Sequence, residues 1–409
     1  MRSVCLAVAF IFGMTACDDG GSRGNGGPTV RDSAGITIVE STAPLWGAED
    51  AWTVSESPTL TIGVMEGDPA YELYRTVDAT RLSDGRIVLA SSGTHELRFY
   101  DAAGTHLHSV GREGGGPGEF RLMGSMDRFG GDSLMVYDLM QRRVSIFDAA
   151  GAHVRDINFA VGGQAILPSV RGRLADGSYL AQLSSRQIGL NAPQIEPGDR
   201  RDSVLALRIG PNGDTFDTVG AFPSSITRVE VLTLGGNSMP LPLPVLFSPS
   251  CIMIAAQGGI VAGTSDTYDV RFYTPGGILQ RIVRREHVPL PVTPADVDSM
   301  EAQLGNAMAQ ANIPAELRSM YDDRPSAETM PAFRALTTDS ENNLWVEEYR
   351  RPGDDVPRWS VFDPEGQFLG LVTGPAGVRV MDIGADYLLG LVTDEMDVER
   401  VVLYGLTKP

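Results

Sequence analysis

Few residues of this 409-residue sequence form a recognisable catalytic motif. The segment Thr94–Phe99 reads THELRF and begins like the metal-binding helix of zinc proteases, but Phe99 stands where the second histidine is required. Lys408 is the only lysine, so the body of the chain lacks the side chain used in Schiff-base chemistry. These motifs therefore do not identify an enzyme class.

A second group of residues suited to chemistry is charged and dispersed along the chain. Carboxylates and guanidinium groups bind a polar ligand only when the fold brings them to one place. Their chemistry consequently depends on the elements that position them. The members of this group are Arg75, Asp78, Asp127, Arg171, Arg334 and Asp382.

Those elements belong to an internal repeat with four short strands in each unit. Apolar runs rich in β-branched and aromatic residues alternate with turn residues, a pattern that predicts strands. Glycine recurs at two turns of the unit, as expected for hairpins that need positive φ. The turn before the fourth strand contains Gly104, Gly151, Gly213, Gly277 and Gly366, and the turn after the first strand contains Gly85, Gly131, Gly177 and Gly259.

The repeat predicts an all-β fold, a six-bladed β-propeller that occupies residues 34–409. Gly104 and Gly151 are 47 positions apart, a length that suits one four-stranded blade. The last unit ends at 401–404 without a fourth strand, whereas residues 59–63 resemble a fourth strand without its first three. We therefore expect the two chain ends to pair in one blade, which closes the ring and removes exposed sheet edges.

The segment Gly111–Phe120 reads GREGGGPGEF and resembles the signature between blades of NHL-repeat propellers. Over residues 34–407 the chain is similar to the six-bladed β-propeller lipoproteins of bacteria, most of which are uncharacterised. The resemblance implies the propeller fold. It implies no particular activity, because that family includes binding modules, scaffolds and a few enzymes.

The six dispersed charged residues fall at predicted first strands, which line the central channel of a propeller. Two interpretations are open: the charges pair with one another around the opening, or they bind a small polar ligand. Asp78 and Asp127 would suit Ca²⁺, but the sequence has no contiguous calcium-binding loop. We predict neither a bound metal nor a cofactor.

Histidine and cysteine give little support for a further site. His106, His108 and His153 fall on predicted fourth strands at the outer rim, where blades diverge, so we expect surface histidines rather than shared metal ligands. Cys251 lies in the apolar run SCIMI and is predicted to be a small buried residue.

The N-terminus is predicted to direct and anchor the protein. Residues 1–17 combine Arg2, a short apolar stretch and the segment MTAC, which indicates a bacterial lipoprotein signal with Cys17 as the lipidated residue. An ordinary secretory signal is the alternative. Residues 18–33 are expected to form a flexible tether. These features predict a place in the bacterial cell envelope, facing the periplasm or the exterior, with membrane contact through the lipid alone.

Two segments depart from the repeat. Residues 223–249 include MPLPLP and are predicted to be an extended loop of polyproline character. Residues 293–323 change to helical periodicity from Thr293 onward, with one apolar stripe. That stripe either packs on the propeller or belongs to a lid or docking helix over the channel.

Acidic residues outnumber basic ones by 52 to 33, and the net charge of −19 disfavours nucleic-acid binding. We therefore expect a monomeric, lipid-anchored binding or scaffold propeller that recognises a protein, a peptide or a small polar ligand on one face. The alternative is a propeller enzyme, a metal-dependent lactonase-like hydrolase or a lyase, with its site in the channel. The lack of a catalytic motif favours a protein without enzymatic activity.

Overall fold

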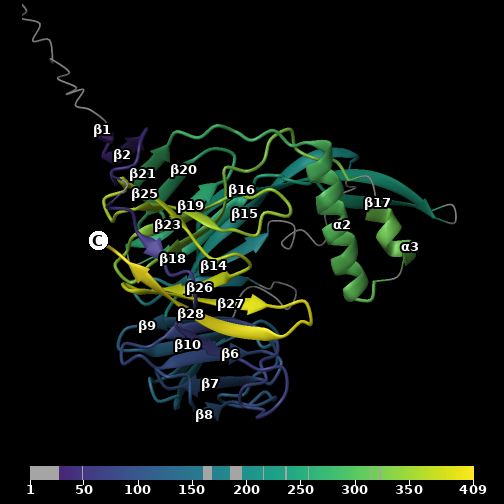
Figure 1. Ribbon diagram of the computed structural model, residues 1–409. Helices are drawn as coiled ribbons and strands as arrows, with labels where there is room; N and C mark the ends of the chain where they lie inside the picture. The colour runs from purple at the N-terminus through teal and green to yellow at the C-terminus, as the bar shows by residue number, and fades with distance from the viewer. Residues whose placement is uncertain are drawn as a thin grey trace, which may run out of the picture.

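The computed structural model describes residues 27–47, 49–159, 168–184, 196–214, 216–234, 237–256, 258–313, 315–321 and 324–409. The predicted signal peptide with Cys17 and the first part of the predicted tether lie outside these residues. The described residues form six sheets, which successive segments of the chain supply in turn (Figure 1). This arrangement is the predicted all-β propeller, with one blade in each sheet.

Four blades contain a run of four antiparallel strands that are consecutive in sequence. Blade 1 is β5 (Thr76–Arg81), β6 (Ile87–Ser91), β7 (Glu96–Tyr100) and β8 (His106–Val110), and blade 2 is β9 (Met123–Phe129), β10 (Ser133–Asp138), β11 (Arg143–Phe147) and β12 (His153–Asn158). Blade 4 is β18 (Cys251–Ala256), β19 (Gly259–Thr264), β20 (Asp269–Tyr273) and β21 (Leu279–Arg285), and blade 5 is β22 (Phe333–Thr338), β23 (Leu344–Glu348), β24 (Arg358–Phe362) and β25 (Phe368–Thr373).

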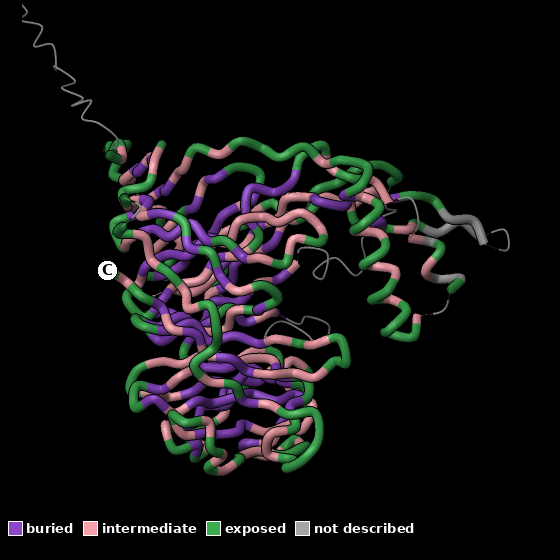
Figure 2. The backbone as a smooth tube through the Cα atoms, viewed as in Figure 1, coloured by how far each residue is buried: buried purple, intermediate pink, exposed green. Residues whose placement is uncertain are grey.

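The core lies between the blades. Strands β6 and β11 are buried along their whole length, because their blades stack on neighbours through both faces. The outer strand β8 instead alternates between partly buried and exposed residues. Figure 2 shows the same gradient, with buried residues concentrated along the sheets.

Glycine turns set the length of the hairpins, as predicted. The five glycines before the fourth strands have φ between 76° and 89°, a region that side chains with a Cβ resist. At Gly151 a Cβ would also lie 2.8 Å from the ring of Phe99 in blade 1. The Asp148 carboxylate completes this turn by accepting hydrogen bonds from the N–H groups of Ala150 and Ala152, both at 2.9 Å.

Blade 6 joins the two ends of the chain and confirms the predicted closure. Its strands are β26 (Arg379–Ile383), β27 (Tyr387–Thr393), β28 (Glu399–Thr407) and, from the N-terminal region, β4 (Leu60–Ile62). Strand β4 runs antiparallel to β28, with Ile62 opposite Val401 and Leu60 opposite Leu403.

The N-terminal residues contact three successive blades from outside. Strand β1 (Thr29–Ser33) pairs with β2 (Ile36–Ser41), and β2 adds in parallel to β21 of blade 4. Leu45 and Trp46 donate backbone hydrogen bonds to Phe368 and Leu369 of blade 5, at 3.0 and 2.8 Å. Strand β3 (Thr53–Val54) and then β4 pair with β28. We call residues 29–62 the N-terminal belt. The last five residues of the predicted tether therefore form a strand.

Blade 3 shows that the prediction of a polyproline loop was wrong. The blade is β13 (Ser169–Arg173), β14 (Tyr179–Ser184), β15 (Gly198–Ile209), β16 (Phe216–Leu234) and β17 (Asn237–Pro244), and β17 pairs with β16 along its whole length. Pro240, Pro242 and Pro244 occupy alternate positions of this edge strand and are exposed. Alternate residues of a strand point their N–H groups to the same side, so these prolines remove donors that would face solvent, and the ladder stays intact.

The predicted helical insertion is confirmed as α2 (Pro294–Gln310), α3 (Ala315–Arg318) and a 3₁₀ turn, η1 (Ser319–Tyr321). Thr293 begins α2 with a capping box that it shares with Asp296. Val297, Met300 and Leu304 pack against a cluster formed by Leu246, Phe247 and Met330, so the apolar stripe covers connections next to blade 4.

The insertion and the β16–β17 ribbon project on the same side of the sheets (Figure 1). We call this side the insertion face; first strands begin here, since β18 and β22 follow these two segments. No helix of the described residues is long and apolar enough to cross a membrane.

Candidate functional site: the central channel

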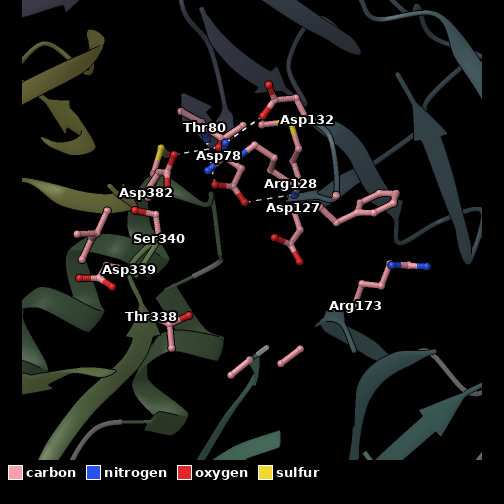
Figure 3. Close-up of a pocket in the computed structure, with 18 of the residues that line it drawn as sticks. Asp78, Thr80, Asp127, Arg128, Asp132, Arg173, Thr338, Asp339, Ser340 and Asp382 are labelled. Carbon is pink, nitrogen blue, oxygen red and sulfur yellow. Dashed lines mark hydrogen bonds and ion pairs between the residues drawn. The ribbon is translucent and has the colours of Figure 1, made fainter. Parts of the chain in front are cut away.

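The central channel holds two adjoining cavities of about 560 and 350 Å³, in the size range of small-molecule sites. Residues from the first strands line both cavities, and both include Asp78, Asp127 and Asp382. Figure 3 shows the larger cavity with these three carboxylates. The larger cavity extends to the turns that follow the first strands. The smaller cavity extends toward the insertion face and includes Arg171.

Carboxylates connect neighbouring blades at this level of the channel. Asp382 of blade 6 accepts hydrogen bonds from Thr80 Oγ1 and from the N–H group of Arg81 in blade 1, each at 2.9 Å. Asp78 of blade 1 accepts one from the N–H group of Met126 in blade 2, at 3.2 Å. Because each of these carboxylates bonds to the next blade, the pair holds blades 6, 1 and 2 in register.

Asp127 faces the third blade in a similar way. Its Oδ2 atom lies 3.1 Å from the position that a Cβ would occupy at Gly172, and a Cβ there would also lie 2.9 Å from Ala255. Gly172 has a φ of 129°, so both the space and the backbone favour glycine. The missing side chain leaves the carboxylate of Asp127 room at the wall of the channel.

Enclosure by protein changes the acidity of two of these groups. Burial raises the pKa of Asp78 to about 7, in spite of hydrogen bonds from Met126 and Ala79, and the charges of Asp127 and Asp382 add to the increase. Burial likewise raises the pKa of Asp127. Both side chains keep some exposed surface, which faces the cavity. Among the described residues, neither carboxylate forms an ion pair.

Arg171 is the cationic counterpart in the smaller cavity. Its Nε donates a hydrogen bond to Oε1 of Gln182 at 2.9 Å, and no carboxylate of the described residues pairs with its guanidinium. Burial lowers the pKa of Arg171, although the residue as a whole is exposed to solvent. Both observations fit a side chain that is surrounded by channel walls but open to the cavity.

The structure thus brings together Asp78, Asp127, Asp382 and Arg171 from the six predicted site residues. Arg75 lies outside the cavities: it is exposed just before β5, with its guanidinium 5.3 Å from the ring centre of Tyr74. Arg334 lines a separate cavity beneath α2, where its Nε atom lies 3.6 Å from Oε1 of Glu347.

The sequence analysis did not identify Tyr387, which contacts one of the carboxylates. Tyr387 donates a hydrogen bond from its hydroxyl to Asp382 at 2.8 Å. Arg128 forms an ion pair with Asp132 at 3.0 Å. The side chain of Arg173 points away from the three carboxylates (Figure 3), although its backbone N–H group bonds to Asp127. No motif marks Tyr387, since it is an ordinary aromatic residue at the start of a strand.

The other candidate ligands lie where they were expected. His106 and His153 are on the outer strands β8 and β12, and His153 Nε2 is 2.9 Å from Asp156 Oδ1. Cys251 is buried as a free thiol, which confirms its predicted place in the core. The described part of the chain has no group of three or more His, Cys, Asp or Glu side chains positioned to hold a metal ion.

A ring of blades around a lined channel places this chain in the β-propeller class. No protein-family model and no curated protein matches the chain. Among solved structures, it is similar to a member of the DUF4221 family from Bacteroides vulgatus, with a TM-score of 0.50 and 10% identity over 88% of this chain and 99% of that one.

Lower scores relate the chain to two other solved structures. Virginiamycin B lyase from Staphylococcus aureus has a TM-score of 0.40 at 10% identity, with coverage of 87% of this chain and 99% of the lyase. The calcium-binding protein regucalcin from Agrobacterium tumefaciens has a TM-score of 0.37 at 9% identity, with coverage of 88% and 95%. At 10% identity, the likeness to the DUF4221 structure shows a shared fold and leaves function to the site.

Proposed function

We propose that this protein is a binding propeller of the bacterial cell envelope, anchored through lipid on Cys17, which holds a small polar ligand in its central channel. The observation that carries the proposal is the charge in one cavity: the carboxylate of Asp127 and the guanidinium of Arg171 face it without an ion-pair partner among the described residues. A ligand with polar groups would occupy positions that no described side chain fills.

Ligand-observed NMR by saturation transfer tests this proposal on the mature chain with Cys17→Ser. The probes are mixtures of amino acids, hydroxy acids, sugars and polyols. We expect signals from at least one compound with this chain and with the control Asp84→Asn, which alters an exposed carboxylate paired with Arg86. Asp127→Asn should abolish them. Channel binding is wrong if no compound gives a signal or if Asp127→Asn leaves the signals unchanged.

The lipid anchor has its own test. Cells that express the full chain, Cys17→Ala or Cys251→Ala are grown with radioactive palmitate, and the membrane fraction is analysed. We expect label and membrane association for the full chain and for Cys251→Ala, because Cys251 is a buried core residue. Label that persists in Cys17→Ala would remove the anchor from the proposal.

One observation favours an enzyme as the second candidate. A carboxyl group with a pKa of about 7 inside a cavity, as at Asp78, is suited to general acid–base catalysis near neutral pH. The test measures hydrolysis of γ-thiobutyrolactone by chelator-treated protein before and after Ca²⁺ is added. Turnover that requires Asp78 but survives Asp84→Asn would favour the enzyme, and the absence of turnover in every sample would count against a lactonase.

A further inference from the structure

The middle of the channel has an excess of acidic groups. Three carboxylates, those of Asp78, Asp127 and Asp382, line both cavities. Arg128 also lines the larger cavity, but it already pairs with Asp132 at 3.0 Å. A cationic group placed beside Asp127 would reduce the repulsion among these carboxylates.

The smaller cavity also presents a cation whose hydrogen-bonding capacity is largely unused. A guanidinium has five N–H donors in a planar fork, and only the Nε donor of Arg171 has an acceptor among the described residues. The fork matches the two oxygens of a carboxylate. A dianion such as phosphate fits less well, because ionised carboxyl groups of the channel would repel it and the chain as a whole has a net charge of −19.

Arg171 and Asp127 approach the cavity from adjacent blades at nearly the same level. Gly172 directly follows Arg171, and its Cβ position would lie 3.1 Å from Asp127 Oδ2. Consecutive Cα atoms are about 3.8 Å apart, so the carboxylate of Asp127 lies close to the point on the channel wall where the Arg171 side chain begins. They do not form an ion pair. A ligand that bridges them therefore carries opposite charges and is small enough for a cavity of about 350 Å³.

From this arrangement we infer that the channel ligand is a small zwitterion of the amino-acid type, with its ammonium group at Asp127 and its carboxylate at Arg171. This inference rests on the proposed function and names the class of its ligand. Neutral sugars and polyols can form hydrogen bonds with both charged side chains but offer no opposite charge to either, and a simple amine or a simple acid would neutralise only one of them.

Isothermal titration of the mature Cys17→Ser chain with each of the twenty proteinogenic L-amino acids tests the ligand class. For the tightest binder, two further probes are titrated: the amine that lacks the carboxylate, and the acid that lacks the amino group. Each removed charge should weaken binding by about ten- to a hundredfold, because it leaves one charged side chain unpaired.

Substitutions then assign each charge of the ligand to a side chain. Arg171→Gln should weaken the amino acid by about ten- to a hundredfold and leave the affinity of the amine probe unchanged. Arg155→Gln is the matched control, since Arg155 is exposed on the outer strand β12. Thermal unfolding shows which variants are folded. If Arg171→Gln does not fold, titration of the parent chain with the amine and the acid probes decides whether the ligand is a zwitterion.

The outcomes separate the two levels of the proposal. If compounds bind in an Asp127-dependent manner but none is a zwitterion, or if removal of either charge leaves affinity unchanged, the zwitterion assignment is overturned while channel binding stands. If no compound binds at all, the proposed function and the ligand class fail together.

Discussion

Asp78 occupies a position that opposes its own ionisation. Backbone hydrogen bonds from Met126 and Ala79 hold its carboxylate in place, while burial and the charges of Asp127 and Asp382 raise its pKa to about 7. An unfolded chain would ionise the same group near pH 4. The protein therefore keeps a proton at this point in the channel that an unfolded chain releases.

This difference predicts how stability depends on pH. Asp78 contributes most below pH 4, and its contribution to the free energy of unfolding is lost as pH rises toward 7, because only the folded state still binds the proton. Asp78→Asn cannot ionise, so its stability should fall less than that of the parent between pH 5 and 8. We expect a difference of about 1–2 kcal/mol, since exposure to the cavity reduces the full linkage effect.

Urea unfolding at the two pH values provides the measurement, with Asp84→Asn as the control at an exposed carboxylate. Identical pH dependence in the parent and in Asp78→Asn would show that the folded state does not hold this proton. Asp127, whose pKa burial also raises, should leave some pH dependence in the variant.

At this scale the sequence predicted the central carboxylates and Arg171, because the first strands of a propeller line its channel. Arg334 lies on the first strand β22 but outside the channel cavities, since the side chains of a strand alternate between its two sides. Arg75 shows the limit of that reasoning: it precedes β5 by one residue and has a φ of 52°, which places it beyond the strand pattern. The hydrogen bond from Tyr387 to Asp382 depends on a side-chain position that no spacing rule specifies.

Among the elements, β17 protects an exposed sheet edge with its prolines. The N–H group of Val245 donates a hydrogen bond to the carbonyl oxygen of Ile226 at 3.1 Å. The backbone N–H groups of odd-numbered residues therefore point toward β16, and the nitrogen atoms of the prolines at 240, 242 and 244 point outward. The combined substitution of these three prolines by Thr should restore outward donors and allow pairing between copies of the chain. Size-exclusion chromatography should then show dimers or aggregates that the parent does not form. A variant that stays monomeric at high concentration would contradict this role.

The capping box of α2 gives a second prediction at this scale. Asp296 N–H donates to Oγ1 of Thr293 at 3.3 Å, and Thr293 N–H donates to the Asp296 carboxylate at 2.9 Å. Thr293→Ala removes the first of these bonds and should cost the start of the helix about 1 kcal/mol. Hydrogen exchange should become about fivefold faster in the first turn of α2. The exposed mid-helix change Ser299→Ala should leave that turn unaffected, and equal exchange in both variants would argue against the cap.

These two elements also show what local patterns can predict. The start of α2 was readable because Thr293, Pro294 and Asp296 act on each other within one turn. Strand β17 was not, because prolines at alternate positions favour polyproline geometry in isolation. Only its pairing with β16, which the sequence does not reveal, makes it a strand.

In the whole molecule, the N-terminal belt contributes to blade 4, blade 5 and the closure of blade 6. A chain that begins at residue 43 loses β1 and β2 but keeps the closure, so it should fold as a monomer with a lowered melting temperature. A chain that begins at residue 64 also loses β4, and it should show no cooperative transition. Circular dichroism melts of both chains provide the test. A cooperative melt of the shorter chain at the full-length temperature would refute the role of the closure.

The sequence indicated the ring closure, because one terminal unit lacked a fourth strand and the other terminus held a strand without its unit. It did not indicate that β2 would pair in parallel with β21. Residues 36–41 lie far in sequence from residues 279–285, and nothing in either segment specifies the partner.

The closure also sets the order in which the polypeptide can acquire its structure. Thr59 bonds to the carbonyl oxygen of Leu403, 344 positions later. Strand β4, which is synthesised early, can therefore pair only after β28 has been synthesised near the end of the chain. The intervening blades have mostly local pairings and can stack early, whereas so distant a contact carries a large entropic cost and forms late. Until that step, the unpaired edge of β28 is open to other chains, and refolding from denaturant should end in a slow phase that sets the yield of native protein.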